Sequence, residues 1–251
     1  MKHVLLALLL VLALAPVVDA APAGALVSGS AAASSTDTGL GGTYVTSSVT
    51  LTANRLELLS IGLSACCTGD PAVTSTGATW VLHCQVGRRL FVYRTMVSSN
   101  QTGAVTITMP GGEGATNGGW SIVEWTGVDT GGTNGSAAAG QCDPAEQVAS
   151  SLTVNMSGFS SASNRPYVTW KASASGTQTV ESGWTSLADT NDGTDGQHYS
   201  TWWRDDTTDT TPFYSFSSSQ QIRGLAIDVK APVTVGSCSP GFHVCGGGLI
   251  Q

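Results

Sequence analysis

The sequence predicts an all-β protein, and the fold we expect is an antiparallel two-sheet β-sandwich with jelly-roll-like connections. From residue 43 onward, short segments rich in Val, Ile, Thr and aromatic residues alternate with turn residues such as Gly, Asn, Asp and Ser. No stretch shows a sustained helical period with start and stop signals. About eleven short strands without helices are best accommodated by two packed sheets.

The first half contains four segments that predict strands. Segment 44–51 alternates Val with Ser and Thr, which is the pattern of a half-buried strand. Segment 55–65 is nearly all apolar, as expected for a central strand. Segments 79–86 and 89–97 flank the dipeptide 87–88, Gly-Arg, a connection suited to a hairpin.

Two further strands and a long loop lead to the middle of the chain. Segment 104–109 alternates strictly, and segment 119–126 places Glu124 on one face and Trp125 on the other. Apolar residues accompany both of them, so we expect this strand to be covered on both sides. Residues 127–147 are rich in Gly, Asn and Thr and predict a long loop.

The second half predicts six more strands, each bounded by turn residues. A domain boundary in the long loop is disfavoured, because each half alone would leave a sheet face uncovered. The expected strands are 151–156, 166–172, 183–187, 199–205, 213–217 and 222–230.

The chain divides into a leader, a lead-in, one domain and a tail. Residues 1–20 have the basic start, apolar run and small-residue cut site of a signal peptide, with cleavage expected after Ala20. An uncleaved anchor is the alternative, and no later stretch is apolar and long enough to span a bilayer. Residues 21–42 predict a flexible lead-in, 43–231 the sandwich, and 232–251 a tail with Gly and Cys. We therefore expect a secreted or cell-surface protein.

Composition restricts the partners. The chain has a net charge of −7, only 11% charged residues and no basic cluster, so nucleic acid and anionic membrane are excluded as main partners. The abundant Ser and Thr leave a hydroxyl-rich surface, and the partner we expect is a glycan or a cell-surface or particle component. The oligomeric state is left open.

The chain has six cysteines, an even number that in an exported protein predicts up to three disulfides. Their spacing lacks the paired CxxC pattern of a zinc site. Cys238 and Cys245 enclose six residues, and we expect them to pair with each other. The pairing of the other four cysteines stays open. The arrangement considered joins Cys84 to one of the adjacent residues Cys66 and Cys67, and Cys142 to the other.

Seven stretches resemble a loosely defined group of jelly-roll, concanavalin-A-like domains found in bacterial exported proteins and in phage structural or tail-associated proteins. They are TANRLELLSIGLS, GATWVLHCQVGRRLFVYRTM, GAVTITM, WSIVEWTGVDTGGTNGS, SGWTSLAD, STWWRDDTTD and IRGLAIDVK, within residues 50–230. The resemblance implies the sandwich fold but no catalytic residues, since most members have no assigned activity. The cysteines and the SCSPGFHVC segment depart from the group's pattern.

Candidate catalytic groups do not form a recognisable set. The chain has no GxSxG motif, and no histidine is tied to a nucleophile. Glu124 is the best single candidate for glycosidase chemistry, which needs two facing carboxyl groups, but Glu57 stands alone on its strand. We favour an ion pair between Glu124 and an arginine such as Arg94. No catalytic residue is assigned, and we expect a protein that is not an enzyme.

The segment 189–195, DTNDGTD, offers oxygen ligands at alternate positions, and calcium prefers such a set. The candidate metal ligands are Asp189, Asn191 and Asp195. Gly193 stands where an EF-hand-like loop needs an oxygen ligand, so an ordinary turn is the alternative reading. Calcium is thus the one cofactor that the sequence leaves open.

A candidate ligand site combines this segment with two tryptophans. Asp192 and Asp195 offer exposed carboxylates, and an exposed ring of Trp202 or Trp203 can stack on a sugar. Adjacent residues of a strand face opposite ways, and burial of both rings is the alternative. We also expect the 127–141 loop to join the 189–198 segment in one polar rim.

The sequence therefore predicts a secreted or surface-displayed binding or structural module, with weak carbohydrate binding as the activity considered. The first alternative is a carbohydrate-active enzyme on a jelly-roll fold. The second is a phage-type virion or tail-associated structural protein.

Overall fold

The computed structural model describes residues 21–32, 42–63, 68–110, 117–174, 178–192 and 197–232. Within these ranges the chain forms strands and no helix, and every strand pair is antiparallel, which confirms the all-β prediction. No helix able to cross a membrane is found in the described part of the chain.

Two large sheets contain most of the strands. In the five-stranded sheet the spatial order is β1 (Ala21–Ala32), β10 (Asn117–Thr126), β4 (Leu56–Leu63), β7 (Leu90–Thr95) and β6 (Val81–Val86). In the six-stranded sheet it is β11 (Ala139–Thr153), β16 (Phe213–Val229), β12 (Arg165–Ala172), β15 (Gln197–Arg204) and β14 (Trp184–Asp192), with β13 (Gln178–Thr179) pairing with β16.

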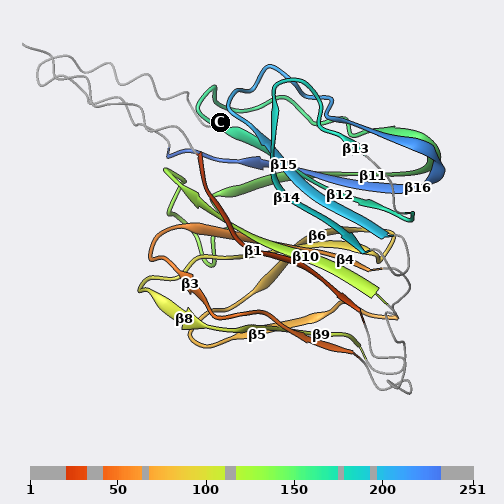
Figure 1. Ribbon diagram of the computed structural model, residues 1–251. Coiled ribbons are helices and arrows are strands. Elements are labelled where there is room, and N and C mark those ends of the chain that lie inside the picture. The colour runs from red at the N-terminus through yellow and green to blue at the C-terminus, as the bar shows by residue number, and fades with distance from the viewer. Residues whose placement is uncertain are drawn as a thin grey trace, which may run out of the picture.

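Two smaller sheets lie on the other side of the five-stranded sheet, so that this sheet is the middle of three layers (Figure 1). One small sheet has the order β2 (Thr43–Val45), β9 (Val105–Thr108) and β5 (Ala72–Ser75). The other pairs β3 (Val49–Leu51) with β8 (Gln101–Gly103). The third layer is a feature that the sequence-based prediction of two sheets does not include.

The two large sheets face each other strand by strand. β4 contacts β12, β10 contacts β14 and β15, β1 contacts β14, and both β6 and β7 contact β16. The two sheets therefore have corresponding ends, which we name by their residues. One end, where Gly62 lies near Lys171, is called the Lys171 end, and the other, where Trp125 packs on Tyr167, is called the Tyr167 end.

Middle-sheet strands are buried on both faces because both neighbouring layers cover them. In β4, Leu58 packs toward the six-stranded sheet, whereas Leu59 and Ile61 pack toward the third layer. In β10 the alternation is the one expected from the sequence, with Trp120 and Ile122 on the third-layer side and Val123 and Trp125 on the other. All eight residues of β4 are buried.

A third apolar cluster covers the outer face of the six-stranded sheet. It contains Trp170, Trp202 and Tyr214, all with 0% exposure, and the Trp202 and Tyr214 rings stack 5.7 Å apart. This cluster explains why β12 and β15 are nearly continuous runs of buried residues.

One close approach between the large sheets depends on glycine. Gly62 and Gly119 are direct partners in the β4–β10 ladder, and the Tyr199 ring from β15 lies against both. A Cβ at Gly119 would lie 2.0 Å from Tyr199 Cδ2, and one at Gly62 would lie 2.2 Å from Cδ1. The missing side chains let the ring occupy the space between the sheets.

Three sequence-based expectations for the elements are wrong. The predicted flexible lead-in contains β1, because the open edge of β10 offers backbone partners that small residues can use as well as large ones. The predicted loop 127–147 ends at residue 138, because β11 begins at Ala139. The last two predicted strands, 213–217 and 222–230, belong to one strand, β16, which pairs with β11 at residues 213–215 and 220–229 on either side of a register shift.

The predicted Gly87-Arg88 hairpin between β6 and β7 is confirmed, with both residues at positive φ, 57° and 50°. The predicted strand 44–51 is divided between β2 and β3, which belong to different small sheets. The leader, 1–20, and the tail from residue 233 lie outside the described residues.

Candidate functional site

The β14–β15 hairpin carries the residues that the sequence selected as a ligand or metal site. Asp189 lies on β14 with 52% of its side chain exposed, and its Oδ1 lies 2.7 Å from His198 Nε2 on β15. Asn191 and Asp192 complete β14, opposite His198 and Gln197. Asp195 lies outside the described residues. The structure therefore places the Asp189 carboxylate against a histidine.

His198 connects this exposed carboxylate to the core. Its side chain is only 3% exposed, and burial lowers its pKa although Asp189 acts in the opposite direction. The neutral ring donates from Nε2 to the carboxylate, which can only accept, and its Nδ1 accepts from the Tyr214 hydroxyl at 3.0 Å. The pKa of Tyr214 is raised by burial, so the hydroxyl keeps its proton. The hydrogen bonds that link Asp189, His198 and Tyr214 fix the β14–β15 hairpin to the rest of the sheet.

The two adjacent tryptophans of β15 point to opposite faces, as the sequence predicted. Trp202 is fully enclosed in the outer cluster, where its ring lies 5.6 Å from that of Trp170. Trp203 is half-buried between the large sheets and meets Trp125 edge to face at 6.1 Å. Trp202 is thus a core residue, whereas Trp203 packs on Trp125 with part of its side chain still exposed.

The two loops expected to form one polar rim lie at opposite ends of the six-stranded sheet. β12 separates them. Its first residue, Arg165, lies at the end where the 127–138 loop enters β11, and its last, Ala172, pairs with His198 beside the β14–β15 turn. Eight residues of strand separate the loops by roughly 25 Å, so the single-rim expectation is wrong.

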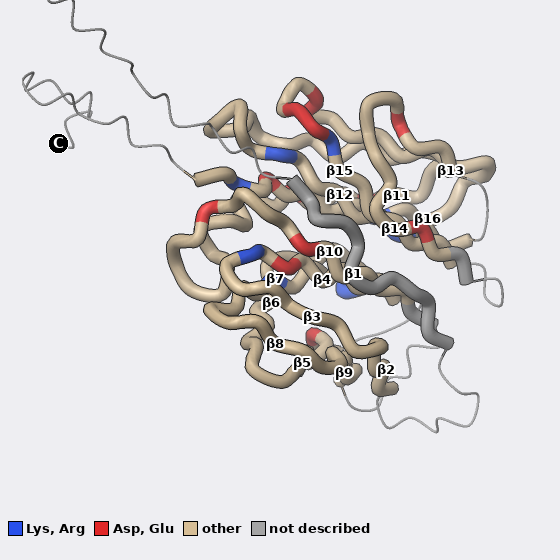
Figure 2. Tube along the Cα trace, turned by 60° about the vertical axis from the view of Figure 1, so that its left-hand side comes forward, with Lys and Arg blue, Asp and Glu red and all other residues tan. Residues whose placement is uncertain are grey.

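A pair of carboxyl groups that sequence reasoning missed lies in the middle sheet. Glu57 on β4 and Glu124 on β10 are directly opposite partners, and both are buried, at 0% and 3% exposure. Arg55 forms an ion pair with Glu124, and the backbone N–H of Thr52 donates to Glu124 Oε2 at 3.2 Å. Figure 2 shows two acidic positions side by side near β4 and β10, with basic positions close by.

The partner of Glu124 differs from the arginine that the sequence suggested. Arg94 donates instead to the carbonyl oxygens of Thr133 and Asn134, at 3.1 and 2.6 Å, and so holds the 127–138 loop. Arg55 replaces it because the β3–β4 turn brings this residue next to Glu124.

The two carboxyl groups have opposite protonation behaviour. Burial, followed by the negative charge of Glu124, raises the pKa of Glu57 to about 9. Burial also acts to raise the pKa of Glu124, but the hydrogen bonds and charge supplied by its neighbours, Arg55 among them, lower it below its usual value. At neutral pH the pair therefore holds one proton, on Glu57, and one negative charge, on Glu124.

Such a pair can move a proton, but here it is sealed between layers. A small cavity also lies between the two large sheets, lined by hydroxyl groups that include those of Ser60, Ser121 and Thr201. Its volume of about 10 Å³ fits one water molecule and not a sugar ring. A glycan ligand would therefore have to bind on the outer surface.

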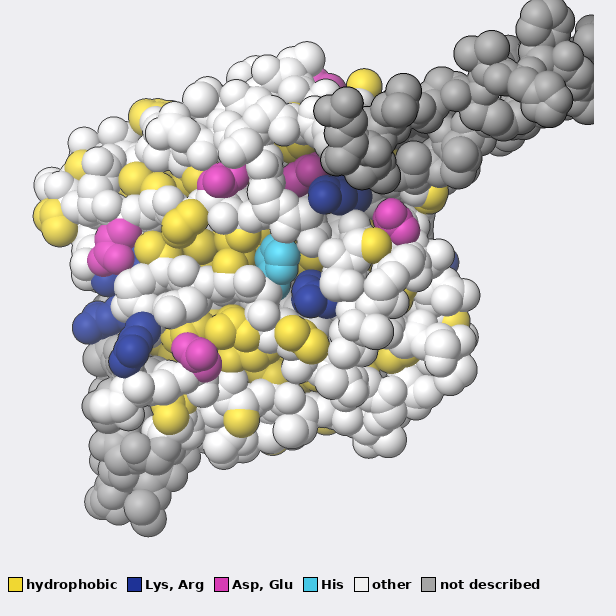
Figure 3. Space-filling view, turned by 180° about the vertical axis from the view of Figure 1, so that it is seen from behind, with side chains coloured by type: hydrophobic (Ala, Val, Ile, Leu, Met, Phe, Trp, Pro, Cys, Tyr) yellow, Lys and Arg dark blue, Asp and Glu magenta, His cyan; other side chains and the backbone are white. Residues whose placement is uncertain are grey.

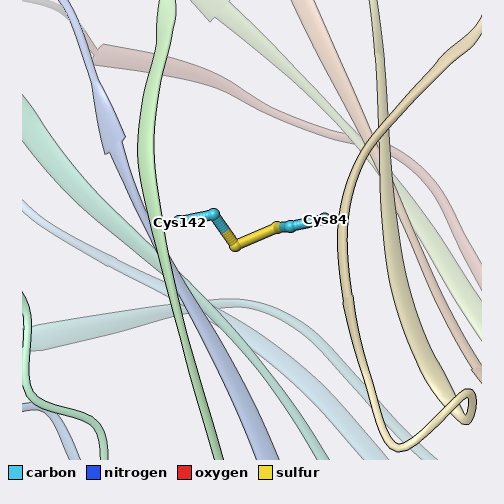
Figure 4. Close-up of a disulfide and its surroundings, with 2 residues drawn as sticks. All are labelled: Cys84 and Cys142. Atoms are coloured by element: carbon cyan, nitrogen blue, oxygen red, sulfur yellow. A yellow bond between two sulfur atoms is a disulfide. The ribbon is translucent and has the colours of Figure 1, made fainter.

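A disulfide joins the two large sheets at their edges. Cys84 on β6 and Cys142 on β11 are bonded, with their Cα atoms 6.4 Å apart and their positions 58 apart in sequence (Figure 4). The arrangement in which each of them pairs with Cys66 or Cys67 is therefore wrong. Facing edge strands place these two side chains together, which spacing in sequence cannot reveal. Those two cysteines and the predicted Cys238–Cys245 pair lie outside the described residues.

The described residues contain no group of three or more His, Cys, Asp or Glu side chains placed to hold a metal ion. Comparison of the chain with protein-family models, curated proteins and solved structures gives no match.

Proposed function

We propose that the protein is an exported β-module with a binding or structural role, which acts through its outer surface. The observation that carries this proposal is the disulfide between the edges of the two large sheets. A disulfide persists in oxidising, extracytoplasmic environments, which agrees with the signal peptide predicted for residues 1–20. The two large sheets would be the jelly-roll sandwich, with the third layer added on one face.

The ligand we propose is a glycan bound weakly at the β14–β15 hairpin. Asp189 is exposed there and held in place by His198, and exposed Thr185 and Ser186 lie on the same edge strand. Hydroxyl and carboxylate groups on a rigid strand match a hydroxyl-rich ligand. Asp192, the last residue of β14, and Asp195, outside the described residues, remain the sequence-based candidates.

A glycan array probed with the purified mature chain, with calcium and with a chelator, tests this proposal. Binding should fall when Asp192 and Asp195 are both replaced by Ala, and it should persist in Asp129→Ala. Asp129 is a matched control because it lies in the 127–138 loop at the Tyr167 end. Absence of glycan binding at millimolar concentration, or equal loss in both variants, would overturn the ligand assignment.

The carboxyl pair favours a second candidate, a carbohydrate-active enzyme. Glu57 and Glu124 supply one protonated and one ionised carboxyl group, the set that glycosidases use. Their burial favours the binding module instead. Release of reducing sugar from any polysaccharide, lost in Glu124→Gln, would establish the enzyme.

A further inference from the structure

Four hydroxyl side chains face one another between the two large sheets. In the middle sheet Ser60 is the direct partner of Ser121, and in the six-stranded sheet Thr169 is the direct partner of Thr201. Each lies two residues along its strand from a residue that belongs to, or packs against, the apolar cluster between the large sheets, so its side chain points into the same interface. All four residues are at most 3% exposed. A group of hydroxyls therefore interrupts the otherwise apolar contact between the sheets.

Tyr167 on β12 adds a fifth hydroxyl to this group. Its hydroxyl oxygen lies 2.7 Å from Ser60 Oγ, so one hydrogen bond already joins β12 to β4. Burial raises the pKa of Tyr167 to about 12, and the neighbouring hydroxyls of Ser60, Ser121 and Thr201 act in the opposite direction. The phenol therefore keeps its proton at neutral pH, and the whole group is uncharged.

Two hydroxyls of the group lack a partner. Ser121 Oγ and Thr201 Oγ1 are close enough to the Tyr167 hydroxyl to act on its pKa, but neither forms a hydrogen bond with any described residue. A buried polar group without a partner destabilises the folded state, and in native proteins an ordered water commonly supplies the missing hydrogen bond.

Hydroxyl groups on the outer surface are in a different position. Most of the face seen in Figure 3 is uncharged, and bulk water reaches the polar groups there. Between the sheets, only a water molecule held at a fixed place can serve Ser121 and Thr201.

The cavity between the large sheets lies beside both unpaired hydroxyls. The four hydroxyl residues of the two ladders all line it, and its volume is about 10 Å³. Small residues leave this space, because its wall also includes Gly62, Gly119 and Ala188. None of the described residues that line it is charged, so it suits a neutral ligand. A space of this size with several polar groups around it is what one buried water molecule requires.

We propose that this cavity binds one ordered water molecule, which joins the two large sheets through hydrogen bonds to Ser121 on β10 and Thr201 on β15. Water both donates and accepts, so one molecule can satisfy the two hydroxyls together. Since these bonds require the two residues to lie opposite each other, the water would help to fix the relative position of the sheets. This site goes beyond the proposed function and does not depend on it.

Magnetic relaxation dispersion of ²H and ¹⁷O in solvent water counts the long-lived water molecules of the folded mature chain. Ser121→Ala/Thr201→Val removes the two hydroxyls that would hold the water, so this variant should retain one long-lived water fewer than wild type. Ser47→Ala/Thr74→Val is the matched control, since it removes the same groups from exposed positions and should leave the count unchanged. An equal count in wild type and in Ser121→Ala/Thr201→Val, or an equal loss in both variants, would overturn the site.

A crystal structure of the wild-type mature chain, at a resolution that shows ordered water, tests the site without any substitution. A density peak should lie about 2.5–3.0 Å from both Ser121 Oγ and Thr201 Oγ1. If the cavity shows no such peak, or if the two hydroxyls bond to protein groups instead, the proposal is wrong.

Discussion

Replacement of Glu57 by Gln should stabilise the protein at neutral pH, although it alters a fully buried polar residue. The pKa of Glu57 is about 9 in the folded chain, against 4.5 for an unperturbed glutamate. Between these values the folded state retains a proton that the unfolded state releases. The stability due to this group is therefore complete below about pH 4.5 and is lost as the pH rises toward 9.

The size of the effect follows from the same two values. Each unit of pKa difference corresponds to about 1.4 kcal/mol. At pH 7 Glu57 therefore lowers the free energy of unfolding of wild-type protein by about 3 kcal/mol relative to its value below pH 4.5. Gln carries no titrating proton, and its amide N–H can donate to Glu124 as a protonated carboxyl would. Glu57→Gln should thus be more stable by about 3 kcal/mol at pH 7 and nearly equal to wild type near pH 4.5.

Urea unfolding at pH 5, 7 and 8.5, at fixed ionic strength and with the disulfide intact, measures this difference. Glu124→Gln is the control. It should destabilise the protein, because Arg55 loses its carboxylate partner and Glu124, unlike Glu57, is ionised in the folded state. If the difference in free energy of unfolding between Glu57→Gln and wild type does not increase with pH, the protonation state assigned to Glu57 is refuted. So would a variant less stable than wild type at pH 7.

Two further predictions concern the packing between the large sheets. Replacing both Cys84 and Cys142 by Ala should lower the free energy of unfolding by up to about 4 kcal/mol, because the bond closes a long loop between positions 58 apart. A melting curve under non-reducing conditions measures the loss. Gly119→Ala should lower the melting temperature clearly, since its methyl group would meet the Tyr199 ring, and addition of Tyr199→Ala should restore part of the loss. If the effects of Gly119→Ala and Tyr199→Ala on the melting temperature are simply additive, the contact between these two residues is contradicted.

The features that the sequence predicted correctly are those set by local alternation. The opposite faces of Trp202 and Trp203 follow from the two-residue period of a strand. Likewise, Ile227 and Ala226 lie in different clusters, one on each side of β16. The Gly87-Arg88 hairpin follows from its length and from the strands on each side.

The features that sequence reasoning missed depend on register and on which strands become neighbours. Glu57 and Glu124 are 67 positions apart, and only the β4–β10 pairing makes them partners. In the same way, Lys171 and Arg223 are 52 positions apart, and only the β12–β16 pairing makes them partners. A charged residue within a buried apolar strand is the one sequence signal that both pairs share.

β1 was missed for a different reason. Its residues, Ala21–Ala32, are small and have low β-propensity, so composition alone indicates a flexible segment. The open edge of β10 supplies the pairing partner, and that edge exists only once the middle sheet has formed.

Peptide mapping of the protein recovered from outside the cytoplasm, without reduction, tests the central claim of an exported, disulfide-joined β-module most directly. The account predicts an N-terminus at Ala21, a linked peptide that contains Cys84 and Cys142, and a second that contains Cys238 and Cys245. Retention of Met1 with Cys84 and Cys142 as free thiols would contradict it.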